Sequence, residues 1–149
     1  MDNQKPNIIF YCKDPKNTTF KKLESEGASG TISSMLWAAE GLTKAGFSVA
    51  ILNEISDSPP HSERGALFIG LEHKSTCHHF KIAFSEKIIV CVGVDLSPKA
   101  LHIKKNTSAK IWFWHHNPIK TGFTLKNLTE DDIEKHIFVS LNHAIRHLN

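Results

Sequence analysis

Apolar and polar positions alternate along the chain in a way that predicts strands separated by helices and loops. Continuous apolar runs at residues 8–12, 49–52 and 88–92 are typical of strands that are covered on both faces. Between the first two runs, apolar residues recur at helical spacing from residue 31 onward, and Gly46 is placed to end that helix. A strand, a helix and a second strand in this order form a βαβ unit with parallel strands.

The remainder of the chain repeats this alternation less cleanly. We expect residues 13–26 and 56–64 to form polar connections, and the pattern assigns no element to residues 72–85. Further strands are predicted at residues 66–69, 110–114 and 137–139, helices that begin at Pro98 and Thr129, and a final amphipathic segment at residues 142–148. Residues 1–149 are therefore predicted to form a single α/β domain, a Rossmann-like open parallel sheet with helices on both faces in three layers.

The composition is that of one ordinary globular domain. The 149 residues are 40% hydrophobic and 22% charged, which argues against a disordered chain, a collagen and a disulfide scaffold. No apolar stretch approaches the ~20 residues of a membrane-spanning helix, so we expect no membrane span. Cys12, Cys77 and Cys91 are odd in number and far apart, which predicts no disulfide framework and a reducing, cytoplasmic compartment.

The distribution of charge argues against a nucleic-acid partner. The chain has 18 Lys and Arg residues against 15 Asp and Glu residues, and only Arg64 and Arg146 are arginines. Nucleic-acid-binding proteins typically use arginine side chains and concentrate their basic residues on one face. The lysines here are spread along the chain, so we expect a solvated surface and no nucleic-acid partner.

Candidate binding residues lie outside the carboxyl ends of the predicted strands, where ligands bind in open parallel sheets. Polar side chains that follow predicted strands, and that we take as candidates for a substrate cleft, are Glu54, Asn117, Ser140 and Asn142. This edge of the sheet is therefore the expected place of the site.

A loop of small residues, Gly27-Ala28-Ser29-Gly30, precedes the predicted helix and belongs to the same edge. Backbone N–H groups and the helix dipole at such a position attract phosphate or another anion. We therefore predict that Gly27, Ser29, Gly30 and Thr31 bind an anion. The loop matches neither G-x-G-x-x-G nor a Walker loop, so a nicotinamide cofactor is not expected.

His115 and His116 end a predicted strand and are followed by Asn117-Pro118. Successive side chains of a strand point to opposite faces, so one imidazole is expected to face the cleft and the other to pack. A neutral imidazole can orient a sugar hydroxyl or accept a proton, and a charged one can stabilise a phosphate. A buried pair satisfied by backbone groups is the alternative interpretation. The Cys and His residues at positions 73–79 fit no common zinc spacing, so we expect no metal site.

Three stretches occur in an order that is typical of one enzyme family. They are residues 27–49, with the small-residue loop, the helix and the turn Leu42-Thr43-Lys44-Ala45-Gly46-Phe47-Ser48-Val49; residues 110–116, a strand that ends in histidines; and residues 136–140, a late strand that ends in serine. In this order and spacing the chain resembles the N-terminal half of GT-B glycosyltransferases, especially the large retaining family that builds bacterial polysaccharides.

The resemblance implies a domain that binds the acceptor, a glycan or a lipid-linked molecule, while a nucleotide-sugar donor serves as co-substrate. It implies that Gly27 and Gly30 approach the diphosphate of the donor, and that His115 or His116 contacts the transferred sugar. Transfer in this family needs no metal and no permanently bound cofactor. Residues 56–85 would shape the acceptor site.

The resemblance also implies a partner. The C-terminal domain of the family, which carries the nucleotide-sugar pocket, has no counterpart in these 149 residues. We therefore expect a donor-binding domain or subunit, negligible catalysis without it, and a location in the cytoplasm or at the periphery of a membrane. If that partner normally covers the strand ends, exposing them would favour a homodimer. The competing hypothesis is a stand-alone, flavodoxin-like α/β module that binds a nucleotide or a protein without catalysis.

Overall fold

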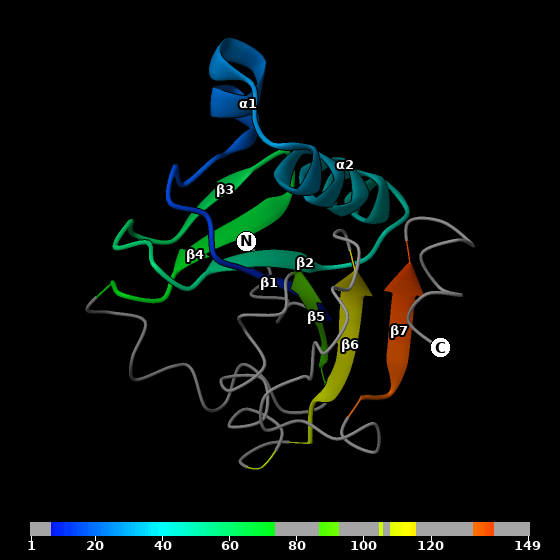
Figure 1. The fold of residues 1–149 in the computed structure, drawn as a ribbon. Helices are drawn as coiled ribbons and strands as arrows, with labels where there is room; N and C mark the ends of the chain where they lie inside the picture. The colour runs from blue at the N-terminus through cyan, green and yellow to red at the C-terminus, as the bar shows by residue number, and fades with distance from the viewer. Residues whose placement is uncertain (1–6, 74–86, 93–104, 106–107, 116–132, 139–149) are drawn as a thin grey trace, which may run out of the picture.

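The computed structural model describes residues 7–73, 87–92, 105, 108–115 and 133–138 (Figure 1). The helices and strands of these residues are, in chain order, β1 (Ile8–Cys12), α1 (Phe20–Glu26), α2 (Gly30–Lys44), β2 (Val49–Asn53), β3 (His61–Glu63), β4 (Ala66–Gly70), β5 (Ile88–Val92), β6 (Lys110–His115) and β7 (Lys135–Phe138). The continuous apolar runs of the sequence thus correspond to β1, β2 and β5, and the helical spacing from residue 31 corresponds to α2.

The strands form one sheet in the order β3-β4-β2-β1-β5-β6-β7. Every neighbouring pair is parallel except β3 and β4, which form an antiparallel hairpin at one edge. Counted in chain order without β3, the parallel strands lie in the order 3-2-1-4-5-6, which is the Rossmann order. The predicted Rossmann-like α/β fold is confirmed. The flavodoxin order 2-1-3-4-5, which the competing hypothesis would require, is not the one adopted.

Alternate side chains of each strand pack on opposite faces of the sheet. Phe10, Ile51 and Phe68 belong to one hydrophobic core, which also contains the buried residues of α1 and α2. Ile9 and Tyr11 belong to a second core on the opposite side of the same strands. We call these two sides the Phe10 face and the Tyr11 face. Because both faces bury apolar side chains, the strands are continuous apolar runs in the sequence.

Helix α2 is the crossover of the βαβ unit and packs mainly on β2 and β4. Ser29 caps its start, where the Ser29 hydroxyl accepts a hydrogen bond from the N–H of Ile32. Gly46, at φ 91°, is the left-handed residue just beyond its end, as the sequence predicts. The side chains that α2 buries recur at helical spacing and are Ile32, Met35, Leu36 and Ala39.

Helix α1 and strand β3 lie in segments that the sequence predicts to be polar connections. α1 buries a single side chain, Phe20, and β3 is a three-residue edge strand without an apolar run. One buried residue creates no periodicity, so the sequence pattern does not reveal either element. β7 begins at Lys135, where the pattern predicts the end of a short helix.

Both described helices contribute to the Phe10 face, and neither is long and apolar enough to cross a membrane. The predicted helix that begins at Pro98, nearly all of the one that begins at Thr129, and the amphipathic segment at residues 142–148 lie outside the described residues.

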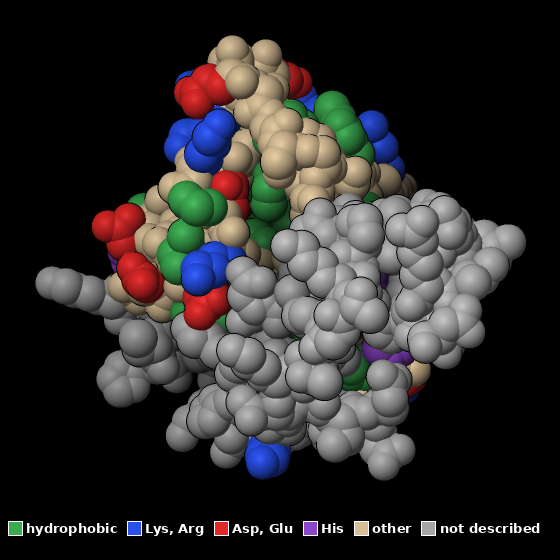
Figure 2. Space-filling view, in the orientation of Figure 1, with side chains coloured by type: hydrophobic (Ala, Val, Ile, Leu, Met, Phe, Trp, Pro, Cys, Tyr) green, Lys and Arg blue, Asp and Glu red, His purple; other side chains and the backbone are tan. Residues whose placement is uncertain are grey.

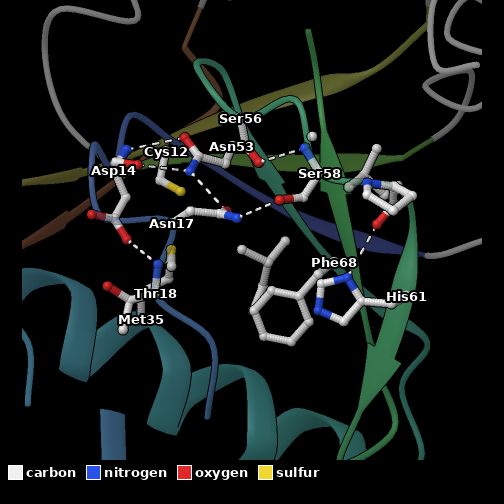
Figure 3. A pocket seen from close by; sticks show the side chains of 14 residues that line it. Cys12, Asp14, Asn17, Thr18, Met35, Asn53, Ser56, Ser58, His61 and Phe68 are labelled. Atoms are coloured by element: carbon white, nitrogen blue, oxygen red, sulfur yellow. Dashed lines mark hydrogen bonds between the residues drawn. The ribbon is translucent and has the colours of Figure 1, made fainter. Parts of the chain in front are cut away.

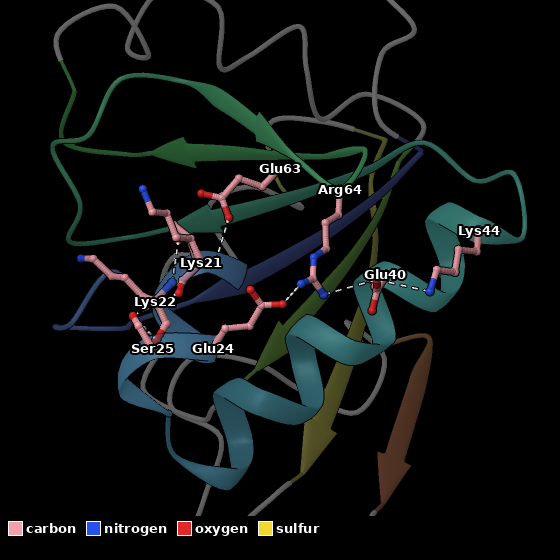
Figure 4. Close-up of polar contacts among 9 residues, drawn as sticks. Lys21, Lys22, Glu24, Ser25, Glu40, Lys44, Glu63 and Arg64 are labelled. Atoms are coloured by element: carbon pink, nitrogen blue, oxygen red, sulfur yellow. Dashed lines mark hydrogen bonds and ion pairs between the residues drawn. The ribbon is translucent and has the colours of Figure 1, made fainter.

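Arg64 connects the β3–β4 hairpin to both helices through ion pairs (Figure 4). Arg64 and Gly65 form the two-residue turn of the hairpin, with φ values of 48° and 80° that are typical of a type I′ turn. The Arg64 guanidinium forms ion pairs with Glu24 on α1 and Glu40 on α2, and its central carbon lies 5.1 Å from the centre of the Phe20 ring. Acidic and basic side chains are interspersed over α1 and this edge of the sheet (Figure 2).

Gly70 ends β4 at a point where the chain after β2 passes close to it. A Cβ atom at this position would lie 2.5 Å from the carbonyl oxygen of Ser56 and 2.7 Å from that of Ser58. We expect Gly70→Ala to lower the free energy of unfolding by ~1–3 kcal/mol, because backbone atoms would have to move. The matched control is Gly41→Ala, which has open space in α2 and should raise that free energy by ~0.5–1 kcal/mol. Urea denaturation measures both, and an unchanged stability of Gly70→Ala would contradict the close approach.

Candidate functional site

A small polar hollow lies at the carboxyl ends of β1, β2 and β4 (Figure 3). Its volume is about 10 Å³, which is room for one water-sized molecule. This is the edge of the sheet at which open α/β folds bind their ligands. The polar side chains that line it come from the end of β2, from the loops after β1 and β2 and from β3, and they include Asp14, Asn17, Asn53, Ser58 and His61.

Asp14 shapes the loop that follows β1. Its buried carboxylate accepts hydrogen bonds from the backbone N–H of Lys16 (3.1 Å) and of Thr18 (2.6 Å). In dinucleotide-binding folds the loop after the first strand uses such N–H groups to hold a pyrophosphate. Here the protein's own carboxylate already occupies these two donors. The Asp14 loop is therefore a closed structural turn rather than a place for a phosphate.

Asn53 joins the loop after β1 to the loop after β2. Its side-chain oxygen accepts a hydrogen bond from the N–H of Asp14 (3.1 Å), and its amide nitrogen donates to the carbonyl of Asp14 (2.8 Å) and to the side chain of Asn17 (3.3 Å). Asn17 in turn donates to the hydroxyl of Ser58 (2.7 Å). The sequence analysis singles out the next residue, Glu54, and misses Asn53. The sequence signal that could have identified Asn53 is an amide side chain at the end of a continuous apolar strand.

Glu54 lies at the carboxyl end of β2, as predicted, and is half-buried. Its backbone N–H donates to the carbonyl of Cys12 (2.9 Å), which continues the pairing of β1 with β2.

Burial raises the pKa of the Tyr11 phenol well above its usual range, and the negative charge of Glu54 raises it further. Tyr11 therefore stays neutral, and its buried hydroxyl has no hydrogen-bond partner among the residues that the structure describes.

The small-residue loop, residues 27–30, is largely exposed to solvent, in contrast to the Asp14 loop. Gly27, Ser29 and Gly30 are exposed, Thr31 is half-buried, and a Cβ atom at either glycine would meet nothing within 4 Å. α2 runs between two parallel strands, so its start lies at their carboxyl-end edge. Met35, in its second turn, lines the polar hollow. The N–H of Gly27 donates to the carbonyl of Leu23 and that of Ile32 to the Ser29 hydroxyl, so the N–H groups of Gly30 and Thr31 are the ones at this helix start that could meet an anion.

His115 packs inside the sheet. It ends β6, is only 3% exposed, and lies on the Tyr11 face beside Phe113. Its Nε2 lies 2.8 Å from Nδ1 of His136 on the neighbouring strand β7, and the two rings stack with centroids 5.1 Å apart. One of the two nitrogens must donate and the other must accept, so at least one of these two ring nitrogens is unprotonated. The sequence analysis missed His136, a lone histidine in a short strand.

The candidate residues thus form two groups on one edge, with β5 between them. Glu54 and the small-residue loop lie at β1 and β2, and His115 lies at β6. The remaining candidates, His116, Asn117, Ser140 and Asn142, lie outside the described residues. Within the described part of the chain, no group of three His, Cys, Asp or Glu side chains is placed to hold a metal ion.

Comparison of the chain with protein-family models, with curated proteins and with solved structures finds no match. The likeness to glycosyltransferases accordingly stays a prediction from the three sequence stretches. Two structural observations are relevant to this prediction: the strand order of the sheet and the geometry of its carboxyl-end edge.

Cys12 and Cys91 are buried free cysteines, and we expect both to be unreactive in the folded protein. Burial, with a smaller effect from the charge of Asp14, raises the pKa of Cys12 to about 12, and burial also raises the pKa of Cys91. Alkylation at pH 8 requires the thiolate, so peptides containing Cys12 and Cys91 should remain unmodified by iodoacetamide until urea is added. Because the folded state holds these protons more tightly, stability should fall as the pH rises above ~8.5. Rapid labelling of either cysteine without urea would contradict their burial.

Asn53→Ala should destabilise the fold, because it leaves the buried N–H and carbonyl of Asp14 without their partner. We expect a loss of ~2–4 kcal/mol in the free energy of unfolding, measured by urea denaturation. Asp57→Ala, an exposed position in the same loop, is the control and should change that free energy by less than ~0.5 kcal/mol. Equal effects of the two substitutions would show that the Asn53 network does not hold these loops together.

Proposed function

We propose that this chain is the acceptor-binding half of a GT-B glycosyltransferase, which transfers a sugar from a nucleotide-sugar donor to a glycan or lipid-linked acceptor in the cytoplasm. The observation that carries the proposal is the exposed loop Gly27–Thr31 at the start of α2, on the carboxyl-end edge of a sheet with the Rossmann strand order. The resemblance of residues 27–49, 110–116 and 136–140 to that family supports it.

The contrast between the two loops on this edge supports an anion at Gly27–Thr31 rather than after β1. The carboxylate of Asp14 uses the N–H groups of Lys16 and Thr18, so the position of a pyrophosphate in a dinucleotide-binding fold is already taken. The open space beside Gly27 and Gly30 lets a ligand approach the backbone. A diphosphate would therefore meet the start of α2.

In the proposed reaction the loop would stabilise the diphosphate that leaves as the sugar is transferred. Backbone N–H groups aimed at a developing negative charge lower the barrier, and the helix dipole adds ~0.3–1 kcal/mol for an exposed anion. A donor-binding domain or subunit would hold the nucleotide on the opposite side of the cleft. No metal or permanently bound cofactor is part of the proposal.

The burial of His115 decides how the two histidines divide their roles in the proposal. His115 uses Nε2 in its contact with His136 and packs on the Tyr11 face. We therefore assign the contact with the transferred sugar to His116, and to His115 the positioning of the strand end. Glu54, Asn117, Ser140 and Asn142 would line the acceptor side of the cleft.

The proposal is tested by titrating the ¹⁵N-labelled chain with UDP-glucose, GDP-mannose and the free nucleotides. We expect shifts of the amide signals of Gly27, Gly30 and Thr31, and a loss of affinity of at least ~10-fold in Gly30→Asp, because a carboxylate there repels a diphosphate. An acidic residue in the first turn suits the helix dipole, so this variant should fold. Gly41→Asp, an exposed glycine farther along α2, is the matched control and should bind as the native chain does.

A second assay separates the enzyme from a binding module. The chain is mixed with a donor-binding half from a retaining GT-B enzyme, and sugar transfer to glycan and lipid-linked acceptors is measured. Transfer that is lost in Gly30→Asp supports the proposal. Nucleotide binding without transfer would favour a stand-alone module, and shifts confined to the opposite edge, near Phe47 and Ser48, would contradict the site.

A further inference from the structure

Three hydroxyl groups line the polar hollow at the carboxyl ends of β1, β2 and β4 (Figure 3). They belong to Thr18, in the loop after β1, and to Ser56 and Ser58, in the loop after β2. Thr18 and Ser56 are buried, with exposed fractions of 7% and 6%. Polar groups this far inside a protein are nearly always hydrogen-bonded, so these hydroxyls are expected to have partners.

The contacts of the three hydroxyls within the described part of the chain leave their hydrogens unused. The oxygen of Ser56 accepts a hydrogen bond from the N–H of Ser58 (3.1 Å), and the oxygen of Ser58 accepts one from the side-chain amide of Asn17 (2.7 Å). The Thr18 hydroxyl forms no hydrogen bond with another described residue. Because each hydroxyl can also donate one hydrogen bond, three donors line the hollow without an acceptor among the described residues.

The hollow has the size and the polarity of a hydration site. Its volume of about 10 Å³ is the space that one water molecule requires, and it is too small for a phosphate or a sugar. Buried water molecules typically form about three hydrogen bonds with polar groups that would otherwise lack partners. The buried carboxylate of Asp14 lines the same hollow and can accept a hydrogen from such a water.

The charge of Asp14 favours water over an ion. Three hydroxyl donors would suit an anion such as chloride, but the neighbouring carboxylate repels it. The carboxylate accepts hydrogen bonds from the backbone N–H groups of Lys16 and Thr18, which already stabilise its negative charge, so a cation is not required. A water molecule both accepts and donates hydrogen bonds, and therefore matches a hollow that is lined by donors and an acceptor.

We propose that one ordered water molecule occupies the polar hollow and joins the loop after β1 to the loop after β2. It accepts hydrogen bonds from the Thr18 hydroxyl and from one of the two serine hydroxyls, and it donates to the Asp14 carboxylate. The water adds a second connection between these loops to the one that Asn53 makes. A substrate then binds outside the hollow. The inference does not depend on the glycosyltransferase function.

The substitution Thr18→Val separates a hollow that holds water from an empty one, because valine keeps the shape of the side chain and removes the hydroxyl. If water accepts from this hydroxyl, the variant loses one hydrogen bond, and we expect its midpoint of urea denaturation to fall by ~0.5 M. In an empty hollow the substitution would replace an unpaired buried hydroxyl by a methyl group, which stabilises the fold. An unchanged or raised midpoint would therefore overturn the proposal.

The matched reference for this measurement is Thr43→Val. The Thr43 hydroxyl donates to the carbonyl of Ala39 in α2 (2.8 Å), so this variant also loses one hydrogen bond from a threonine, at a position away from the hollow. Its midpoint should fall by a similar amount. Circular dichroism of both variants reports whether the fold is kept.

The second test locates the molecule directly. A crystal structure of the native chain, at a resolution that resolves water, should show one peak in the hollow within ~3.2 Å of the Thr18 hydroxyl oxygen and of at least one serine hydroxyl oxygen. Crystals soaked in sodium bromide and in rubidium chloride should give no anomalous signal at this position. An empty hollow, or a bromide or rubidium ion in it, would overturn the proposal.

Discussion

The structure depends on one constraint, which is that a parallel sheet must be joined by right-handed crossovers and covered on both faces. β1 lies inside the sheet, and the chain leaves it first toward β2 and β4 and later toward β5, β6 and β7. A right-handed crossover from β1 to β2 places its helix on one particular face of the sheet. The placement of α2 on the Phe10 face follows from this rule.

The same geometry assembles the candidate site. Parallel strands end at one edge, so the loops after β1 and β2 meet there with the start of α2. The two kinds of loop at this edge differ in structure. The Asn53 side chain pairs with the backbone N–H and carbonyl of Asp14 and so joins the two loops, and the Asp14 carboxylate accepts from the N–H groups of Lys16 and Thr18 within its own loop. The loop from Gly27 to Thr31 stays open to solvent, with its helix N-terminus available to an anion. A rigid support beside an exposed loop suits the proposed transfer from a nucleotide sugar.

The elements with continuous apolar runs or regular helical spacing could be predicted from the sequence. β1, β2, β5 and α2 each bury several side chains. Their apolar residues therefore form continuous runs in the strands and a helical repeat in α2, and both patterns are visible in the sequence. α1 and β3 could not be predicted, because α1 is held by Phe20 and by the contacts of Arg64 from a distant hairpin. The small-residue loop was found because a local motif marks it, whereas Asn53 and His136 act through partners that are distant in the sequence.

By itself, the sequence determined the class of fold and the residues available for chemistry at the strand ends, because period, apolar runs and capping residues are local properties of the chain. Only the tertiary structure decided the strand order, which distinguishes a Rossmann sheet from a flavodoxin-like one. It also decided that His115 packs against His136 and that Asp14 fills its own loop. The physical reason is the same in each case. These outcomes depend on which strands become neighbours, and pairing across the sheet joins residues that the chain keeps far apart.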